Sequence, residues 1–189
     1  MRILLHVCCC HCLARTLVVL RAEFGADLEC HLLWFNPNIH PLIEYRRRLK
    51  AFKMYLERDP LPHTIIDHYG VKDFCRAAGG CFDAPGRCAV CYRTRLTAAA
   101  ERMGAEFDAF GTTLMASREQ PHAFIQKMGA EAAAATGKTF FYRDCSQAEP
   151  PAKLMTGLYK QSYCGCVFSE EDRYRFTRLH LYPVENPKA

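Results

Sequence analysis

Short apolar runs alternate with segments of helical period along this chain of 189 residues. Residues 2–7 have the continuous apolar character of a buried strand, and residues 13–24 place leucines on one helical face before Gly25. We expect further strands at 28–35, 63–67, 107–110 and 139–142, and further helices at 41–58, 92–103, 119–135 and 151–161. The alternation predicts an α/β fold in which helices flank a parallel sheet of about five strands.

The length favours a single domain across residues 1–189, because one domain usually holds about 100 to 200 residues. Half of the residues are apolar, which is enough for a sizeable core. We expect the last residues, about 180–189, to form a loosely ordered tail. In parallel sheets of this kind ligands bind at the carboxyl ends of the strands, so we expect the functional site there.

Cysteine is the unusual component, with 12 among 189 residues. The apolar run before Cys8 is too short for a signal peptide, and charged residues or histidines interrupt every apolar stretch well before about 18 residues. We therefore expect a cytoplasmic protein that has no membrane association. In a reducing cytoplasm, dense cysteines indicate metal binding or redox chemistry more often than disulfides.

Seven cysteines fall into three motifs near predicted strand ends or helix starts: Cys8, Cys9 and Cys12, then Cys88 and Cys91, then Cys164 and Cys166. The spacing of Cys9 and Cys12, and of Cys88 and Cys91, lets two sulfurs converge on one metal or cluster. A structural zinc or one four-iron cluster uses four thiolates, so three remain for a second metal or for redox chemistry. The other cysteines, apart from Cys10 in the first motif, are interpreted as core or incidental residues: Cys30, Cys75, Cys81 and Cys145.

The first cysteine motif also excludes two classes of site. A radical-SAM enzyme would have a third cysteine where this chain has Arg15. A phosphate-binding loop would have glycines whose backbone N–H groups surround the phosphate, and the loop after residues 2–7 has none.

Longer motifs that surround these cysteines extend from residue 5 to residue 166. They are Leu5-His6-Val7-Cys8-Cys9 with Cys12; Phe35-Asn36-Pro37-Asn38-Ile39 with Pro41, Glu44 and Tyr45; Arg87-Cys88 with Cys91; Arg95-Leu96; Thr112-Thr113-Leu114; and Tyr159-Lys160-Gln161-Ser162-Tyr163-Cys164-Gly165-Cys166. In these motifs the chain resembles the QueH family of cobalamin-independent epoxyqueuosine reductases, which complete the wobble-base modification queuosine in tRNA.

The resemblance implies a Rossmann-like domain of the HUP or PP-loop kind that holds a [4Fe–4S] cluster with a mononuclear iron beside it. It divides the seven cysteines into four cluster ligands and three ligands of the second iron. The expected cluster ligands are Cys88, Cys91 and Cys166 with one of Cys8 and Cys9. The other three, with Cys12 and Cys164 among them, are expected to bind the second iron.

The chain departs from the family at Cys10-His11, where a small residue and a proline are usual. Two explanations remain for His11, which either binds metal or shapes the loop. Cys10 lies inside the same loop without a matching spacing of its own.

Reduction of an epoxide to an alkene, with the oxygen lost as water, consumes two electrons and two protons. Side chains do not supply these electrons, so a redox cofactor is needed, and an iron–sulfur cluster passes one electron at a time. An open iron site beside the cluster would polarise the epoxide oxygen. Cys12, as an expected ligand of this iron, is counted among the catalytic residues. The proton donor is either Tyr163 or a metal-bound water, and the alternative for Tyr163 is packing beside a turn.

A tRNA substrate requires phosphate contacts from Lys and Arg and an aromatic ring under a splayed-out base. The net charge of +5 favours such an anionic partner. The candidate substrate-binding residues are Asn36, Arg95, Thr112, Thr113 and Arg118. The basic face at Arg46, Arg47, Lys50 and Lys53 either binds phosphate or is only solvated, and Tyr92 or Phe35 either stacks on the base or belongs to the core. The electron donor is unidentified, and we expect a monomer.

Two other functions fit part of the pattern. A structural zinc protein that binds nucleic acid would use four cysteines and leave three unexplained. An iron–sulfur electron carrier or disulfide reductase would need no tRNA, and its basic residues would only solubilise it. Binding to tRNA that weakens with salt would separate the electron carrier from the reductase, because neutralised phosphates release counterions.

Overall fold

A parallel sheet lies at the centre of residues 1–176, the part of the chain that the computed structural model describes. Its four strands are β1 (Arg2–His6), β2 (Glu29–Trp34), β3 (His63–Ile65) and β4 (Ala109–Thr112), in the order β3-β2-β1-β4. Every neighbouring pair is parallel, with His6 level with Leu33 of β2 and with Thr112 of β4. The predicted α/β class with a parallel sheet is therefore confirmed, whereas the tail expected at about 180–189 lies outside the described residues.

The sheet has four strands, so the expectation of about five was wrong. The segment predicted as a strand at 139–142 makes only an isolated bridge, in which Phe140 pairs with Phe110. Beyond this bridge the backbone N–H of Cys145 donates to the carbonyl of Met115 at 3.0 Å. The chain thus leaves β4 after one pairing and follows the 3-10 helix η2 (Thr113–Ala116) instead.

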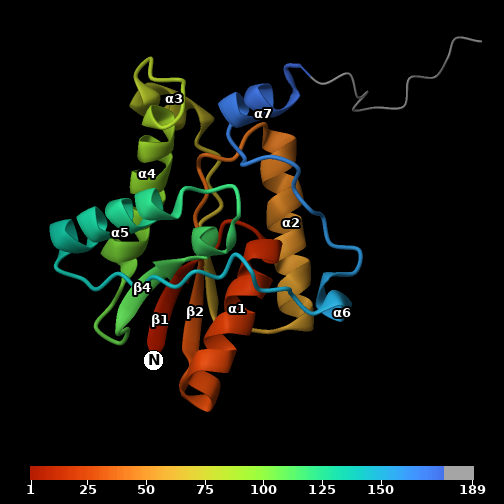
Figure 1. The fold of residues 1–189 in the computed structure, drawn as a ribbon, viewed down its shortest axis with the longest axis vertical. Helices are drawn as coiled ribbons and strands as arrows, with labels where there is room; N and C mark the ends of the chain where they lie inside the picture. The colour runs from red at the N-terminus through yellow and green to blue at the C-terminus, as the bar shows by residue number, and fades with distance from the viewer. Residues whose placement is uncertain (177–189) are drawn as a thin grey trace, which may run out of the picture.

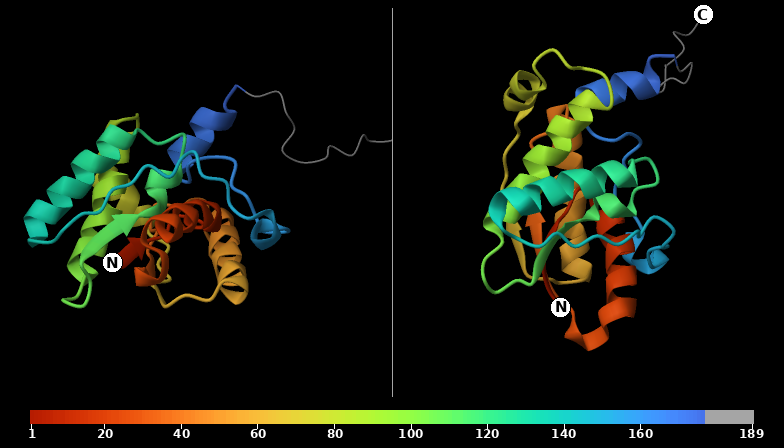
Figure 2. Two further views of the ribbon diagram at one scale, coloured as in Figure 1. Left: turned by 60° about the horizontal axis from the view of Figure 1, so that its bottom comes forward. Right: turned by 60° about the vertical axis from the view of Figure 1, so that its left-hand side comes forward.

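Helices cover both faces of the sheet. Helices α1 (Cys10–Phe24) and α2 (Leu42–Arg58) lie on one side, and α4 (Gly86–Arg102) with α5 (His122–Thr136) lies on the other (Figures 1 and 2). This follows from right-handed crossovers, because β1 to β3 advance toward one edge of the sheet and the chain then returns across the opposite face to β4. Among residues 1–176, every helix lacks either the length or the apolar character that a membrane-spanning helix needs.

Shorter helices complete the structure: α3 (Val71–Ala78), α6 (Ala152–Met155), α7 (Val167–Tyr174) and the 3-10 helix η1 (Gly25–Asp27). Neither α3 nor α7 was predicted. The helix predicted at 151–161 was wrong beyond its first turn, since α6 ends before Gly157, which has a φ of +72°.

Two helices begin earlier than predicted, and this changes the position of the cysteines. Helix α1 begins at Cys10 rather than at residue 13, and α4 begins at Gly86 rather than at residue 92. Cys88 and Cys91 therefore lie in the first turns of a helix and not in a loop. Residues three apart on a helix share a face, so both sulfurs can serve one site.

The carboxyl ends of the strands point to one end of the molecule. The start of α4 and helix α7 lie at this same end, at the top of Figure 1. The loop that carries Cys8 and Cys9 follows β1 directly. All three cysteine motifs are thus brought to the edge of the sheet where a ligand site was expected.

Candidate metal centre

Cys8, Cys9 and Cys12 form a compact buried group, called here the first-loop cysteines. Their sulfurs lie within 4.8 Å of one another. Cys9 caps the start of α1, where its sulfur accepts a hydrogen bond from the backbone N–H of Cys12 at 3.3 Å. Two sulfurs bound to one ion at about 2.3 Å are about 4 Å apart, so sulfurs that already lie this close to one another could hold a single metal ion.

Side chains from distant parts of the sequence hold the first-loop cysteines. The hydroxyl of Thr113 accepts from the backbone N–H of Cys8 at 2.9 Å and donates to the Cys8 sulfur at 3.2 Å. The amide nitrogen of Gln161 donates to the Cys9 sulfur at 2.9 Å. Such donors orient metal ligands and stabilise their negative charge.

Hydrogen bonds among these thiols shift their pKa values in opposite directions. Hydrogen bonds from Cys12 and Cys8, followed by the nearby charge of Arg48, lower the pKa of Cys9 well below its usual value. Hydrogen bonds to Cys8 and Cys9, together with burial, raise the pKa of Cys12. Because metals bind thiolates, Cys9 is the sulfur best prepared to act as a ligand.

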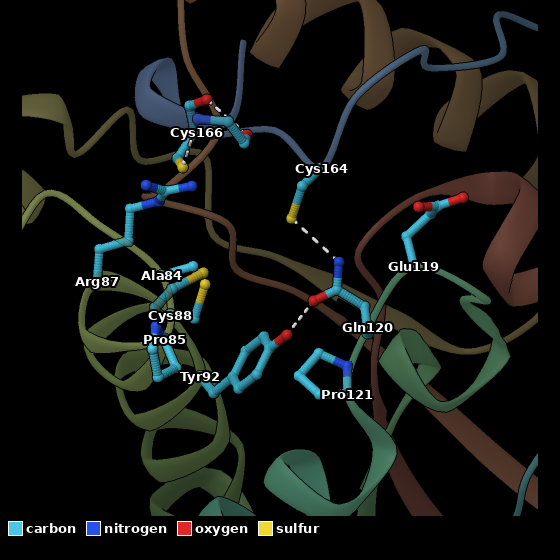
Figure 3. A pocket seen from close by; sticks show the side chains of 12 residues that line it. Ala84, Pro85, Arg87, Cys88, Tyr92, Glu119, Gln120, Pro121, Cys164 and Cys166 are labelled. Carbon is cyan, nitrogen blue, oxygen red and sulfur yellow. Dashed lines mark hydrogen bonds between the residues drawn. The ribbon is translucent and has the colours of Figure 1, made fainter. Parts of the chain in front are cut away.

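Cys88, Cys91, Cys164 and Cys166 form a second group, called here the pocket cysteines. All four line a cavity of about 230 Å³ between the start of α4 and the segment before α7 (Figure 3). Cys91 and Cys166 are buried, Cys88 is half-buried and Cys164 is exposed. Burial raises the pKa of Cys91 to about 12, and the charge of Arg95 opposes this effect.

The pocket cysteines are more widely spaced than the first-loop cysteines. Within residues 1–176, only Cys8, Cys9 and Cys12 form a group of three or more possible ligands mutually within 4.8 Å. The pocket cysteines therefore exceed the span of one ion. Four thiolates around a cavity match the number and type of ligands that a four-iron cluster needs.

A second cavity of about 530 Å³ connects the two groups, since its walls include Cys8, Cys12 and Cys164. The two cavities share Glu119, Gln120, Cys164 and Ser169. The larger one is lined by more basic than acidic residues. Its basic residues are Arg15, Arg48, Arg95, Arg118, Lys160 and Arg173, and its acidic ones are Glu119 and Asp172.

Two of the predicted substrate-binding residues line this larger cavity. The buried guanidinium of Arg95 donates to the Cys91 sulfur at 2.8 Å and to the Cys91 carbonyl at 3.2 Å. Arg118 is exposed and donates to the Ser146 carbonyl at 3.0 Å and to Glu149 at 3.1 Å. Arg118 is therefore accessible to a ligand, whereas the guanidinium of Arg95 is buried and hydrogen-bonded to Cys91.

Three other predicted substrate-binding residues, Asn36, Thr112 and Thr113, are buried and line neither cavity. The Asn36 amide donates to the carbonyl of Val7 at 2.8 Å. The Thr112 hydroxyl is 2.9 Å from a ring nitrogen of His6. Together with the Thr113 contacts to Cys8, these bonds hold the end of β1 in place. All three residues therefore position the loop of Cys8 and Cys9 from the buried side, away from the cavities.

Tyr163 and His11 both line the larger cavity. The Tyr163 hydroxyl donates to the carbonyl of His40, and burial raises its pKa well above the usual value. His11 is half-buried, and its Nε2 has no hydrogen-bond partner among the described residues. The Cys10 sulfur faces the carbonyl of Tyr159 at 4.0 Å, and Cys10 lines neither cavity.

The family model described as epoxyqueuosine reductase QueH matches residues 3–172. The chain belongs to the QueH family. A relative from Dehalococcoides mccartyi is 30% identical over 177 residues, which cover 92% of this chain and 94% of the relative. Relatives from Haemophilus influenzae and Thermotoga maritima are each 29% identical to this chain. Each match covers 90% of this chain, and the matches cover 72% and 91% of the two relatives, respectively. All three are named epoxyqueuosine reductase QueH.

The QueH match extends over both cysteine groups, and the structure adds three residues to which the sequence had assigned no role. Arg48 is buried and donates to the carbonyls of Tyr163 and Cys164 at 2.9 and 3.0 Å. Gln161 reaches Cys9, and Gln120 reaches Cys164. Gln161 lies within a motif of the QueH resemblance, whereas Gln120 has no sequence signal.

The structure also shows where the basic residues of α2 and the two candidate stacking rings lie in this QueH chain. The basic residues Arg46, Arg47, Lys50 and Lys53 are all exposed along α2. Tyr92 is buried and lines the smaller cavity. Phe35 is half-buried beneath the guanidinium of Arg102, 5.5 Å from its ring centre, and lines neither cavity.

Proposed function

We propose that this protein reduces epoxyqueuosine to queuosine at the wobble position of tRNA, as the last step of queuosine biosynthesis. The reaction removes the epoxide oxygen as water and consumes two electrons and two protons. The observation that carries the proposal is the pair of adjoining cysteine groups in a chain of the QueH family. One group has the span for a single ion, and the other has the ligand number for a cluster.

The pocket cysteines would hold a [4Fe–4S] cluster, and the first-loop cysteines would hold a mononuclear iron. When bound, the cluster supplies single electrons and the iron supplies a Lewis acid for an oxygen. This division differs from the one that the resemblance implied, in which Cys8 or Cys9 joined the cluster and Cys164 joined the second iron. The support for it is spatial, because Cys8 and Cys9 lie with Cys12 and Cys164 lines the cavity of Cys88, Cys91 and Cys166.

The larger cavity would receive the modified nucleoside. Arg118, Lys160 and Arg173 line it and supply positive charge for tRNA phosphates. Cys12 and Tyr163 line the same cavity, as expected for residues at the reacting centre. To donate a proton there, Tyr163 would first have to release the His40 carbonyl. Asn36, Thr112 and Thr113 would act indirectly by positioning the first loop.

The strand order and the free cysteines support the same function. The strand order β3-β2-β1-β4 is the first part of the Rossmann order, so we assign the domain to the Rossmann-like class of HUP or PP-loop type. All 12 cysteines lie within the described residues and are unpaired. Free thiols in this number suit a reducing cytoplasm, which is also where tRNA is modified.

The direct test uses protein purified without oxygen, tRNA that carries epoxyqueuosine, and dithionite as the electron source. We expect the modified nucleoside to lose the mass of one oxygen atom in digests of the tRNA. A variant with Cys12→Ala should abolish this loss, whereas Cys30→Ala should retain it. A zinc-stapled nucleic-acid binder or an electron carrier would bind tRNA or cycle electrons without changing the nucleoside, and that result would overturn the proposal.

A further inference from the structure

Three side chains form a continuous chain of hydrogen bonds at the wall of the smaller cavity. The hydroxyl of Tyr92 donates to the amide oxygen of Gln120, and the amide nitrogen of Gln120 donates to the sulfur of Cys164 at 3.1 Å (Figure 3). Tyr92 lies on α4, Gln120 lies between η2 and α5, and Cys164 precedes α7. Three separate segments of the chain therefore meet at one cysteine sulfur.

The first member of this chain is rigidly placed. Tyr92 is only 1% exposed, and its ring packs against Phe124 with 5.5 Å between the ring centres. The guanidinium of Arg95 lies over the same ring at 5.8 Å. The Tyr92 hydroxyl is thus a fixed donor, and it occupies the amide oxygen of Gln120. Because an amide has its acceptor on one side and its donors on the other, this contact turns the Gln120 nitrogen toward the sulfur.

The last member is held from the backbone side. Arg48 donates to the carbonyl of Cys164 at 3.0 Å, and the next residue, Gly165, donates its backbone N–H to Ser169. Cys164 itself is exposed, unlike the buried Cys91 and Cys166. Packing therefore constrains the Cys164 side chain less than the other two, and the hydrogen bond from Gln120 is the contact that directs its sulfur.

We propose that Gln120 is a positioning residue that directs the Cys164 thiolate and thereby raises the reduction potential of the cluster that Cys164 binds. Tyr92 acts on Cys164 through Gln120. This inference rests on the proposed function, in which Cys164 is a cluster ligand. A hydrogen bond to a ligand sulfur withdraws negative charge, so it stabilises the more negative, reduced form of a cluster. Gln120 also lines both cavities, so it would hold Cys164 at the boundary between the cluster and the substrate.

The test is a redox titration of the intact, iron-loaded protein, followed by visible absorbance under anaerobic conditions. We expect the midpoint potential of the cluster to become more negative in Gln120→Leu, and to move in the same direction by less in Tyr92→Phe. The double variant should match Gln120→Leu alone, because a residue that acts only through another adds nothing once that residue is gone. The matched comparison is Gln161→Leu, which removes an amide donor from Cys9 in the adjoining group and should shift this potential by less than Gln120→Leu does.

Failure of the inference and failure of the proposed function give different results. Variants with full iron and sulfide content and an unchanged potential would overturn the inference and leave the function intact. A wild-type protein without sulfide would instead overturn the function. If Gln120→Leu does not retain a cluster, Tyr92→Phe still decides, since it removes one hydroxyl and keeps the amide. Equal shifts in Gln161→Leu and Gln120→Leu would also contradict a specific role at Cys164.

Discussion

The guanidinium of Arg95 lies against the sulfur of Cys91, with Nη2 2.8 Å from Sγ. The two residues are one turn apart on α4 and are 2% and 5% exposed. Within residues 1–176 no carboxylate pairs with Arg95, although a buried cation normally has an anionic partner. The sulfur of Cys91 takes that place, which suits a cysteine that would carry negative charge as the ligand of a metal.

Replacing Arg95 should therefore weaken the fold and the binding of the proposed cluster. We expect Arg95→Leu to lower the free energy of unfolding of the iron-loaded protein by about 3 kcal/mol, the cost of breaking a buried charge pair, and to reduce the bound iron and sulfide. Anaerobic urea unfolding and metal analysis measure the two effects. Arg93→Leu is the control, because Arg93 is on the same helix but 60% exposed, and its loss should cost under about 0.5 kcal/mol. Equal stability and full sulfide in both variants would contradict the assigned role of Arg95.

Gly165 lies between two pocket cysteines, Cys164 and Cys166. Its φ is +135°, a backbone conformation that residues with a side chain rarely adopt. A Cβ at this position would also lie 3.0 Å from Nη1 of Arg48. We expect Gly165→Ala to cost about 1–3 kcal/mol of unfolding free energy and to impair cluster assembly, because Cys164 and Cys166 would be displaced. Gly104→Ala is the comparison, since the three atoms nearest to its new Cβ all belong to the flexible side chain of Glu106. A Gly165→Ala protein with wild-type stability and iron content would show that this backbone geometry is dispensable.

His40 predicts a dependence of stability on pH. Its ring is buried, Nε2 faces the carbonyl of Pro37 at 3.2 Å, and Nδ1 has no partner among the described residues. Burial lowers the pKa of His40 to about 4 from its usual 6.5. The unfolded chain thus takes up a proton first as the pH falls, so the stabilising contribution is complete above about pH 6.5 and is lost toward pH 4.

The expected loss at about pH 5 is roughly 1 to 2 kcal/mol of unfolding free energy. Urea unfolding of wild type and His40→Gln at about pH 7.5 and about pH 5 isolates it, because other acid effects are common to both proteins. The wild type should lose more stability than the variant over this interval. Parallel losses would mean that the folded protein binds a proton at His40 as readily as the unfolded chain does, and they would contradict the prediction.

The sheet and its main helices were predictable because their apolar patterns are long and continuous. Residues 139–142 failed as a strand even though Phe140, Phe141 and Tyr142 suit one, since a strand also needs a continuous partner and the chain turns away to Met115. Helices α3 and α7 were missed for a tertiary reason. Each has eight residues, and Phe74 of α3 packs against Phe168 of α7 with ring centres 6.1 Å apart.

The sequence also indicated which cysteines matter, because their spacing is local. Their division into two groups was not predictable, since it depends on how the loop after β1, the start of α4 and the segment before α7 meet. Gln120 illustrates the limit most clearly. It is an isolated glutamine in the sequence, and only the fold places its amide between Tyr92 and Cys164.

Iron, acid-labile sulfide and zinc contents of protein purified without oxygen decide whether this chain holds a cluster and a separate ion. We expect about five iron to four sulfide in the wild type, for one cubane plus one ion. Cys12→Ala should lose about one iron and keep its sulfide, Cys91→Ala should lose the sulfide, and Cys30→Ala should match the wild type. Zinc without sulfide in the wild type, or equal losses in all three variants, would contradict a site with two iron centres.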